Sequence, residues 1–476
     1  MQTIKTKFRV TKWRLKSLIL ATLLTSNAMA TDIEGDWRSM LKTNDEKIIP
    51  IVIQLEENSG EWTGVLNSPS LEEMKLDITG LEVIDNRIVF EVEALDIKYE
   101  GSYINQVDLI AGANIKKGAS SLTFFSRIND HIDGSSNHSQ TQKKSTPYII
   151  EDVNFKNKET SNLISGTLTK PVSRIKATAV LISGSGPQDR DESLFGHKPF
   201  AVIADHLTRQ GYAVLRYDDR GVGGSSGSYQ TATTKDFASD TSAAVDYLNS
   251  RSDLPQGKTG LIGHSEGGMI APMVASRRDD IAFAILLAGP AVKIPTMLAD
   301  QWYRGRKFNG LSEEILSKLK ELDKEILEKI GNLELNEPLN DAIQDLIYSS
   351  IRLEGVPEED INTQFEEVKK EYSLLIFRDY LKFNPEFYLE QIKAPLLALN
   401  GSLDFQVDAK MNLGNIQSVL NRTGHKDFTV IELDRMNHLF QIANKGSSTE
   451  YAEIKESFSP KALHVISKWL NERFKI

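Results

Sequence analysis

The stretch GHSEGG at residues 263–268 decides the fold of this chain. An apolar run comes before it, and the segment that follows, residues 269–275, is small and apolar. A G-x-S-x-G motif between a strand-like and a helix-like segment indicates a nucleophile elbow, a tight turn that projects Ser265 into open space. A side chain close to the serine would collide with the strand or the helix, and glycine avoids that collision. The elbow glycines are Gly263, Gly267 and Gly268.

The first 30 residues have the pattern of a signal peptide. Six basic residues lead into an apolar run from Leu18 to Leu24, and Ala28-Met29-Ala30 has the small-x-small pattern of a cleavage site. We expect cleavage after Ala30 and export to the periplasm of a bacterium or beyond it, with an uncleaved N-terminal anchor as the alternative. No later segment approaches the length of an apolar membrane span, so no stable span is expected after cleavage.

The composition excludes several classes of function. With 40% hydrophobic residues the chain of 476 residues is too apolar to be disordered and can build a large core. Cleavage would leave 50 basic against 66 acidic residues, which takes the net charge from −10 to −16. Because no basic patch is present, we expect no nucleic-acid partner. The absence of cysteine excludes thiol catalysis and cysteine-ligated metals, and the oligomeric state stays open.

Residues 31–130 are predicted to form a small all-β domain. Strand-like runs alternate there with turn residues, among them Thr79-Gly80, and this spacing is typical of an antiparallel barrel or sandwich. The sequence Gly35-Asp36-Trp37 resembles the G-x-W opening of lipocalin-like barrels. The predicted strands include Ile49–Leu55, Ile84–Val92 and Leu122–Phe125.

Residues 148–476 follow a polar linker, predicted at residues 131–147, in which His131 and His138 are a metal-binding alternative. Strand-like and helix-like segments alternate after the linker, which predicts an α/β fold with a mostly parallel, doubly wound sheet. A charge-dense helical segment at about 291–390 interrupts the alternation, and we expect it to form a cap over the strand ends. The predicted strands are Ala177–Ile182, Ala213–Tyr217, Gly260–Ile262, Ile281–Leu287, Leu396–Asn400 and Phe428–Leu433, preceded by a β segment at Val153–Leu168. The predicted helices are Phe200–Gln210, Phe237–Ser250, Glu266–Ser276, one from Ser402 onwards, and Pro460–Arg473.

A serine hydroxyl becomes a nucleophile when a base takes its proton and a third group fixes the tautomer of that base. His438 lies on a loop after the last predicted strand, where this base is expected. Asp404 follows the preceding strand and a glycine turn, at the end of the sheet where catalytic groups collect, and Asp408 is the alternative. The chain order Ser265, Asp404, His438 differs from that of trypsin-like and subtilisin-like proteases. The histidines set aside are His206, His264, His425 and His464.

The oxyanion that forms on attack needs two preorganised donors. One is the backbone N–H of Glu266, directly after the serine. We assign the second to the N–H of Ser185, in the loop SGSGP at 183–187 after a predicted strand, with a flexible Gly/Ser turn as the alternative. A phosphate site is excluded in this loop, because it has neither G-x-G-x-x-G nor a P-loop lysine.

Taken together, these motifs resemble the α/β-hydrolase superfamily in its esterase and serine-aminopeptidase-like branch, over residues 150–476. The resemblance implies a triad of serine, aspartate and histidine, and no cofactor or metal. Many relatives carry His-Gly where this chain has Ser183-Gly184, which leaves the oxyanion geometry open. The motifs are LISGSGPQDRD at 181–191, RYDDRGVGGS at 216–225, the elbow, LNGSLD at 399–404 and Asn437-His438.

The predicted function is that of an exported serine hydrolase, a carboxylesterase acting on esters of short or medium acyl chain. A serine aminopeptidase-like peptidase and a thioesterase are alternatives with the same residues. A different class is a binding protein with an inactive hydrolase domain and a β domain that recognises the partner. Asp219 and Arg220 are expected to brace the turn after their strand, and residues 189–192 to pair with the cap or shape the pocket.

Overall fold

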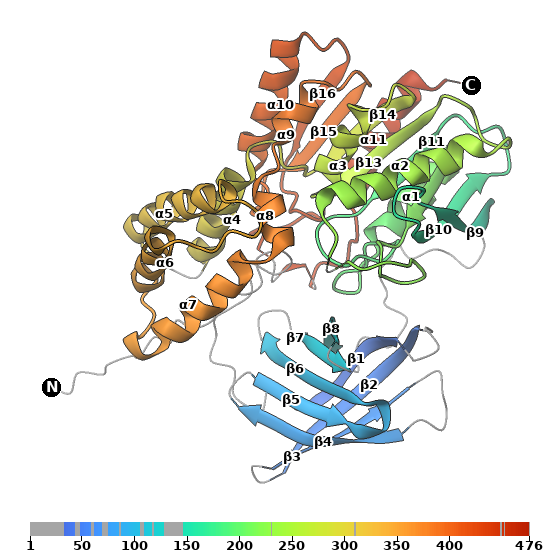
Figure 1. Ribbon diagram of the computed structural model, residues 1–476. Helices are drawn as coiled ribbons and strands as arrows, with labels where there is room; N and C mark the ends of the chain where they lie inside the picture. The colour runs from blue at the N-terminus through green and yellow to red at the C-terminus, as the bar shows by residue number, and fades with distance from the viewer. Residues whose placement is uncertain are drawn as a thin grey trace. The chain divides into compact units, whose positions relative to one another are not determined.

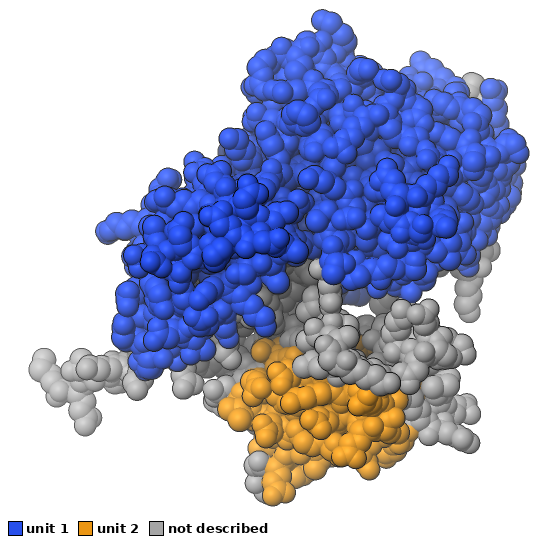
Figure 2. Space-filling view, in the orientation of Figure 1, with its two compact units in different colours: residues 1–22, 138–476 blue, residues 23–137 orange. Residues whose placement is uncertain are grey.

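The structure is a computed structural model that describes residues 33–42, 48–58, 61–68, 75–84, 87–104, 109–116, 119–127, 146–229, 231–308, 311–447, 450–451 and 453–475. The chain divides into two compact units, coloured in Figure 2. Unit 2 lies before residue 138, and the described part of unit 1 lies after it. The predicted signal peptide, His131 and His138 lie outside the described residues, as does all of the predicted linker except its last two residues. No helix in the described ranges is long and apolar enough to cross a membrane.

Unit 2 is an antiparallel β-barrel of eight strands. Each strand pairs with the next, and β1 pairs with β8 at Trp37–Arg127 and Arg38–Ser126, which closes the sheet. Aromatic side chains fill the interior, where the rings of Tyr99 and Phe125 lie 5.2 Å apart and both residues are buried. The predicted antiparallel β domain is therefore confirmed, while its resemblance to lipocalin-like barrels stays a prediction. The strands are β1 (Gly35–Lys42), β2 (Ile48–Asn58), β3 (Glu61–Asn67), β4 (Lys75–Ile84), β5 (Arg87–Val92), β6 (Ile97–Ile104), β7 (Leu109–Lys116) and β8 (Ala119–Arg127).

Two details of unit 2 differ from the sequence prediction. The predicted strand Ile84–Val92 contains the end of β4 and the whole of β5. Thr79-Gly80 lies inside β4, where the register against β5 shifts between Thr79 and Glu82. Gly80 has a φ of +57°, a conformation that glycine adopts without steric cost. The glycine therefore serves a bulge in a continuous strand and not a chain reversal.

The sheet of unit 1 has eight strands in the order β16-β15-β14-β13-β11-β12-β10-β9 (Figure 1). Strands β11 to β16 are parallel, and the β9–β10 hairpin joins them through an antiparallel pairing of β10 with β12. Every residue of β11, β12, β13 and β15 is buried, which explains why these strands are near-continuous apolar runs in the sequence. The predicted fold class is confirmed. The strands are β9 (Tyr148–Lys156), β10 (Leu163–Pro171), β11 (Thr178–Ile182), β12 (Ala213–Tyr217), β13 (Thr259–His264), β14 (Ile281–Leu287), β15 (Leu396–Gly401) and β16 (Phe428–Leu433).

Helices cover both faces of this sheet and enclose two apolar cores. Successive residues of β11 alternate between the cores, with Val180 and Ile182 in one, and Ala179 and Leu181 in the other. Helices α2 (Thr234–Ser250), α3 (Gly267–Ala275) and α10 (Ala409–Thr423) contribute to the first core, and α1 (Pro199–Arg209) and α11 (Pro460–Arg473) to the second. Helix α10 begins at Ala409, later than the predicted start at Ser402.

Six helices lie between β14 and β15 in the chain, and α4 to α8 form a group beside the sheet in Figure 1. A buried arginine holds three of them together, since Arg306 on α4 pairs with Asp323 on α5 and, at 2.6 Å, with Glu354 at the end of α6. Arg304 on α4 also pairs with Asp408 at 2.6 Å, which ties this group to the loop beyond β15. The helices are α4 (Ile294–Phe308), α5 (Glu313–Gly331), α6 (Asp341–Leu353), α7 (Glu358–Tyr372), α8 (Leu375–Leu381) and α9 (Pro385–Leu389).

Candidate active site

Ser265 occupies the turn between β13 and α3. Its φ is +52°, a left-handed conformation that costs a non-glycine residue about 1–3 kcal/mol. Two backbone bonds hold this conformation, because the Ser265 N–H donates to the carbonyl of Leu287 at 2.9 Å, and the Gly268 N–H donates to the carbonyl of Ser265 at 2.8 Å. Ser265 is half-buried while both of its neighbours are buried, so the turn presents the serine to the surface.

The elbow glycines lie where a side chain does not fit. A Cβ atom at Gly263 would lie 1.9 Å from the carbonyl oxygen of Gly267, and one at Gly267 would lie 2.1 Å from the carbonyl oxygen of Ile182. A Cβ at Gly268 would lie 2.5 Å from the Cα of Gly289 on the chain after β14. All three partners are backbone atoms, so the only relief would be a movement of the strand or the helix.

Asp404 and His438 meet beyond the ends of β15 and β16. His438 Nδ1 lies 2.8 Å from Asp404 Oδ2, and the two residues are only 4% and 3% exposed. The other oxygen of Asp404 accepts the backbone N–H groups of Gln406 and Val407 at 2.8 and 2.9 Å, which fixes the orientation of the carboxylate. Since Nδ1 faces a carboxylate, it carries a proton, and Nε2 is the ring nitrogen left to act as a base.

His438 also lies next to the residue that precedes Ser265. The rings of His264 and His438 are 4.8 Å apart between centroids, and His264 Nε2 lies 2.9 Å from the backbone carbonyl oxygen of His438. No hydrogen bond joins the Ser265 hydroxyl to the His438 ring, both of which are described. Such a bond is often formed only in the complex with substrate, so the free geometry does not exclude the pair.

The loop after β11 lies against the elbow, since a Cβ at Gly184 would be 3.1 Å from the Cβ of Ser265. Two amides in this loop are occupied, because the Gly184 N–H donates to Glu192 Oε1 and the Gly186 N–H donates to the Tyr229 hydroxyl, both at 2.7 Å. Among the described residues the N–H groups of Ser185 and Glu266, the two predicted oxyanion donors, have no hydrogen-bond partner. Both amides can therefore donate to a new negative oxygen without breaking an existing bond.

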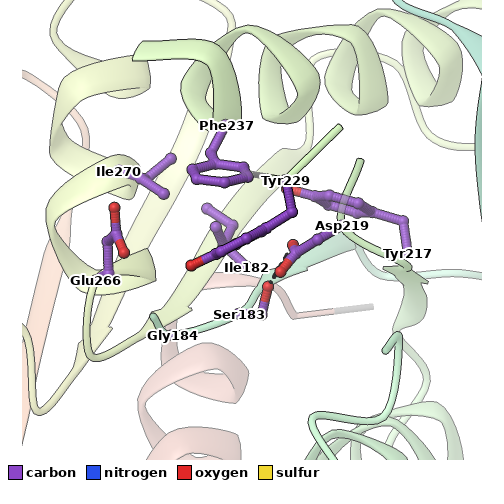
Figure 3. A pocket seen from close by; sticks show the side chains of 9 residues that line it. All are labelled: Ile182, Ser183, Gly184, Tyr217, Asp219, Tyr229, Phe237, Glu266 and Ile270. Atoms are coloured by element: carbon purple, nitrogen blue, oxygen red, sulfur yellow. Dashed lines mark hydrogen bonds between the residues drawn. The ribbon is translucent and has the colours of Figure 1, made fainter. Parts of the chain in front are cut away.

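A small pocket lies behind the same loop, between it and α3 (Figure 3). Asp219 accepts the Ser183 hydroxyl at 2.7 Å on one side of the pocket, and Phe237 and Ile270 line the other. Directly before α3, the side chain of Glu266 accepts hydrogen bonds from the hydroxyls of Ser185 and Thr234, each at 2.8 Å. The pocket is lined by Ile182, Ser183, Gly184, Tyr217, Asp219, Tyr229, Phe237, Glu266 and Ile270.

The two acids of the pocket titrate unusually. Burial raises the pKa of the Glu266 carboxyl above its ordinary value, although the hydroxyls of Thr234 and Ser185 oppose the shift. Burial also raises the pKa of Asp219 well above its ordinary value, against the opposing hydrogen bond from Ser183. A raised pKa widens the pH range in which these acids are neutral and do not repel an oxyanion at the neighbouring amides.

The alternatives considered from the sequence have other contacts. Asp408 caps α10 by accepting the Met411 N–H at 2.7 Å and pairs with Arg304. His425 Nε2 lies 3.1 Å from the carbonyl oxygen of Ala394, before β16 and away from its carboxyl end. His206 and His464 lie in α1 and α11. Within the described ranges, no group of three or more His, Cys, Asp or Glu side chains is arranged to hold a metal ion.

Comparison with known proteins gives matches in this unit. The family described as serine aminopeptidase, S33, matches residues 198–330. Esterase EstD of Thermotoga maritima is 26% identical over 329 residues, which cover 68% of this chain and 69% of that protein. The chain is therefore similar to esterases and, within unit 1, to the serine aminopeptidase family.

Solved structures that resemble this chain include an esterase of Pyrococcus furiosus, with a TM-score of 0.43 and 16% identity over 70% of this chain and 96% of that one. Proline iminopeptidase of Mycobacterium smegmatis gives a TM-score of 0.41 and 14% identity over 68% of this chain and 98% of that one.

Unit 1 also contains contacts that sequence reasoning missed. Glu192, expected to pair with the cap or shape the pocket, instead lies 2.9 Å from His264, which was set aside. Asp219 and Arg220 brace different elements: Asp219 holds the loop after β11, and Arg220 pairs with Asp240 on α2 at 2.7 Å. The cluster RDE at 190–192 was the available signal, but its partners are remote in sequence and follow no periodicity.

Proposed function

We propose that this chain is an exported serine hydrolase that cleaves carboxylic esters of short or medium acyl chain. The observation that carries the proposal is the buried 2.8 Å contact between His438 and Asp404, beside an elbow serine in a left-handed conformation. The esterase similarity of unit 1 supports the choice of ester over amide. The unpaired amides of Ser185 and Glu266 supply the remaining requirement, a place for the oxyanion.

The reaction follows from these positions. Ser265 Oγ attacks the ester carbonyl carbon, and Nε2 of His438 takes the hydroxyl proton. Asp404 stabilises the imidazolium that results, and the carbonyl oxygen becomes an oxyanion at the two free amides. Collapse of this intermediate breaks the bond to the alcohol, which leaves with the proton from His438. Water then attacks the acyl-enzyme by the same route, which releases the acid and restores Ser265.

A second candidate is an aminopeptidase-like reaction that uses the same residues on an amide. The match of residues 198–330 to the serine aminopeptidase family supports it. Matched p-nitrophenyl esters and aminoacyl p-nitroanilides separate the two, because they release the same kind of chromophore from an ester and from an amide. Faster turnover of the anilides would replace the ester proposal by the peptidase.

The first experiment is labelling with a fluorophosphonate probe, which reacts with an activated serine. We expect the wild-type protein to be labelled and Ser265→Ala to be unlabelled. Ser276→Ala is a matched control, because Ser276 lies at the other end of α3 and donates its hydroxyl to the carbonyl of Met273. A wild-type protein that resists the probe, or a labelled S265A variant, would defeat the proposal.

Export is the part of the proposal that rests on sequence alone. Expression of the full chain in a bacterium should give a periplasmic or secreted protein whose first residue is Thr31. N-terminal sequencing of the purified protein tests this directly. A product that retains residues 1–30 would show that the segment remains as an anchor or is not processed.

A further inference from the structure

A buried acid and a buried histidine lie next to the candidate site but take no part in the proposed reaction. Glu192 Oε1 lies 2.9 Å from His264 Nδ1, and the two side chains are 7% and 8% exposed. Glu192 belongs to the loop between β11 and α1, and His264 is the last residue of β13. The contact therefore joins two segments that are 72 residues apart in the chain.

The hydrogen-bond partners fix where the protons of this pair lie. His264 Nε2 faces the backbone carbonyl oxygen of His438 at 2.9 Å, and a carbonyl oxygen only accepts, so Nε2 carries a proton. One further proton lies between Nδ1 and Glu192 Oε1. Burial alone would lower the pKa of His264, but the charge and hydrogen bond of Glu192 raise it above its ordinary value on balance. Glu192 therefore favours the charged form of His264.

The same two side chains hold both halves of the candidate machinery. His264 donates to the backbone of His438, the proposed base. Glu192 Oε1 accepts the Gly184 N–H at 2.7 Å, next to the proposed oxyanion donor Ser185. Occupying the Gly184 amide leaves Ser185 as the free donor of the loop.

The backbone of Glu192 supports this interpretation. Its φ is +51°, a left-handed conformation that is unfavourable for a residue with a side chain, and Phe195 in the same loop has a φ of +52°. Such conformations persist where surrounding contacts over-determine them, and here the side chain of Glu192 is held by Gly184 and His264.

We propose that Glu192 and His264 are positioning residues, which set the proposed base and the oxyanion loop relative to Ser265 through one shared hydrogen-bond chain. The inference rests on the proposed function and deepens it. Neither residue touches the reacting atoms. A displaced catalytic group can cost about 10²-fold in rate, so the effect of breaking the chain falls on kcat.

Two variants break the chain at different atoms. Glu192→Gln keeps the size of the side chain but removes the charge. A neutral His264 that keeps its proton on Nε2 needs a donor at Nδ1, and one amide atom cannot both accept the Gly184 N–H and donate to Nδ1. His264→Phe keeps a ring beside His438 but removes both hydrogen bonds. The matched control is Asp240→Asn, because Asp240 is a buried carboxylate paired with Arg220 at 2.7 Å and bonded to Asn157.

Steady-state hydrolysis of p-nitrophenyl acetate, with melting temperatures for each variant, tests the proposal. We expect E192Q and H264F each to lower kcat about 100-fold with little change in KM, and the double variant to be no slower than the slower single variant. D240N should lose stability but keep a kcat close to that of the wild type. The inference would be overturned if E192Q and H264F keep the wild-type kcat as D240N does, or if they change only KM. It would also be overturned if the loss of kcat in the double variant is the product of the two single losses.

A measurement without turnover checks the bonds themselves. In protein labelled with ¹⁵N at histidine, the His264 signals are those that disappear in H264F. At about pH 8, above the ordinary imidazole value, Nε2 of His264 should carry a proton. A His264 protonated only on Nδ1 could not donate to His438 and would overturn the inference. An inactive, unlabelled wild type would instead defeat the proposed function, so the two failures are distinguishable.

Discussion

Replacing Asp404 by asparagine changes one atom of the candidate site and tests the role of the carboxylate. Asp404 Oδ1 accepts two backbone N–H groups, so the side-chain oxygen of the asparagine would stay there and its NH₂ group would face His438. Nδ1, which lies 2.8 Å from that position, would then have to be unprotonated and accept a hydrogen bond from the NH₂ group. The ring proton would move to Nε2, the nitrogen that must take the proton of Ser265.

The expected loss follows from this change of tautomer. The same substitution in the trypsin triad, a worked case of this effect, lowers kcat about 10⁴-fold, which corresponds to about 5.4 kcal/mol of transition-state stabilisation. The volume of the side chain and its two backbone bonds are unchanged, so the melting temperature should change little. Rates on p-nitrophenyl acetate and thermal unfolding by circular dichroism measure the two quantities separately.

Asp408→Asn is the matched control. Asp408 caps α10 at 2.7 Å and pairs with Arg304 at 2.6 Å. Asparagine keeps a cap oxygen and loses the ion pair, so stability should fall by at most about 1 kcal/mol, with no change in the tautomer of His438. If D408N loses the activity and D404N retains it, the assignment of Asp404 as the orienting carboxylate is wrong.

Three further predictions concern the elbow, the pocket acid Glu266 and helices α4 to α6. Gly263→Ala would place a Cβ 1.9 Å from a backbone carbonyl, so we expect a lower melting temperature and lost activity. Burial raises the pKa of Glu266, so the folded protein keeps a proton that the unfolded chain releases, and stability falls as pH rises from the ordinary glutamate value through the folded value. Glu266→Gln removes this term, and its stability relative to wild type should rise over that pH interval. Arg306→Met leaves Asp323 and Glu354 buried without their cation, which should cost about 3–5 kcal/mol in unfolding free energy.

Each of these predictions has a contradicting result. A fully active Gly263→Ala variant would show that the turn adapts to a side chain. A constant difference in melting temperature between E266Q and wild type across pH would show that Glu266 titrates ordinarily. An Arg306→Met variant of unchanged stability in urea would show that Asp323 and Glu354 find other partners, and Arg352→Met, at an exposed pair, is its control.

The elements that could be predicted from the sequence are the buried strands, because their burial appears as a continuous run of apolar residues. The strands Ala213–Tyr217, Ile281–Leu287 and Phe428–Leu433 have the predicted bounds, because apolar runs between turn signals define them locally. The start of α10 was wrong because the loop before it is stabilised from elsewhere: Asp404 accepts backbone amides there, and Asn400 donates to the carbonyl of Val407 at 2.8 Å. Hydrogen bonds of this kind between side chains and the backbone compete with helix formation and leave no periodic signal.

Some residues of the candidate site could likewise be predicted from the sequence, and others could not. A spacing argument selects Ser265, Asp404 and His438, since strand order places the carboxyl ends of parallel strands at one edge. The contact of Glu192 with His264 depends on how two loops pack, and no local pattern encodes it. Motifs therefore identify the residues proposed to react, while the residues that hold them are visible only in the packed chain.

The closure of the barrel in unit 2 has a mechanical consequence. Among the described residues β1 pairs with β8 at two positions, whereas it pairs with β2 at eight. The Arg127 guanidinium reinforces this seam by donating to the carbonyl of Glu34 and lying 4.1 Å over the Trp37 ring. Separation of β1 from β8 should therefore let the amide protons of β8 exchange with deuterium earlier than those of β2. The fluorescence of Trp37, which lies at this pairing, would report the same event.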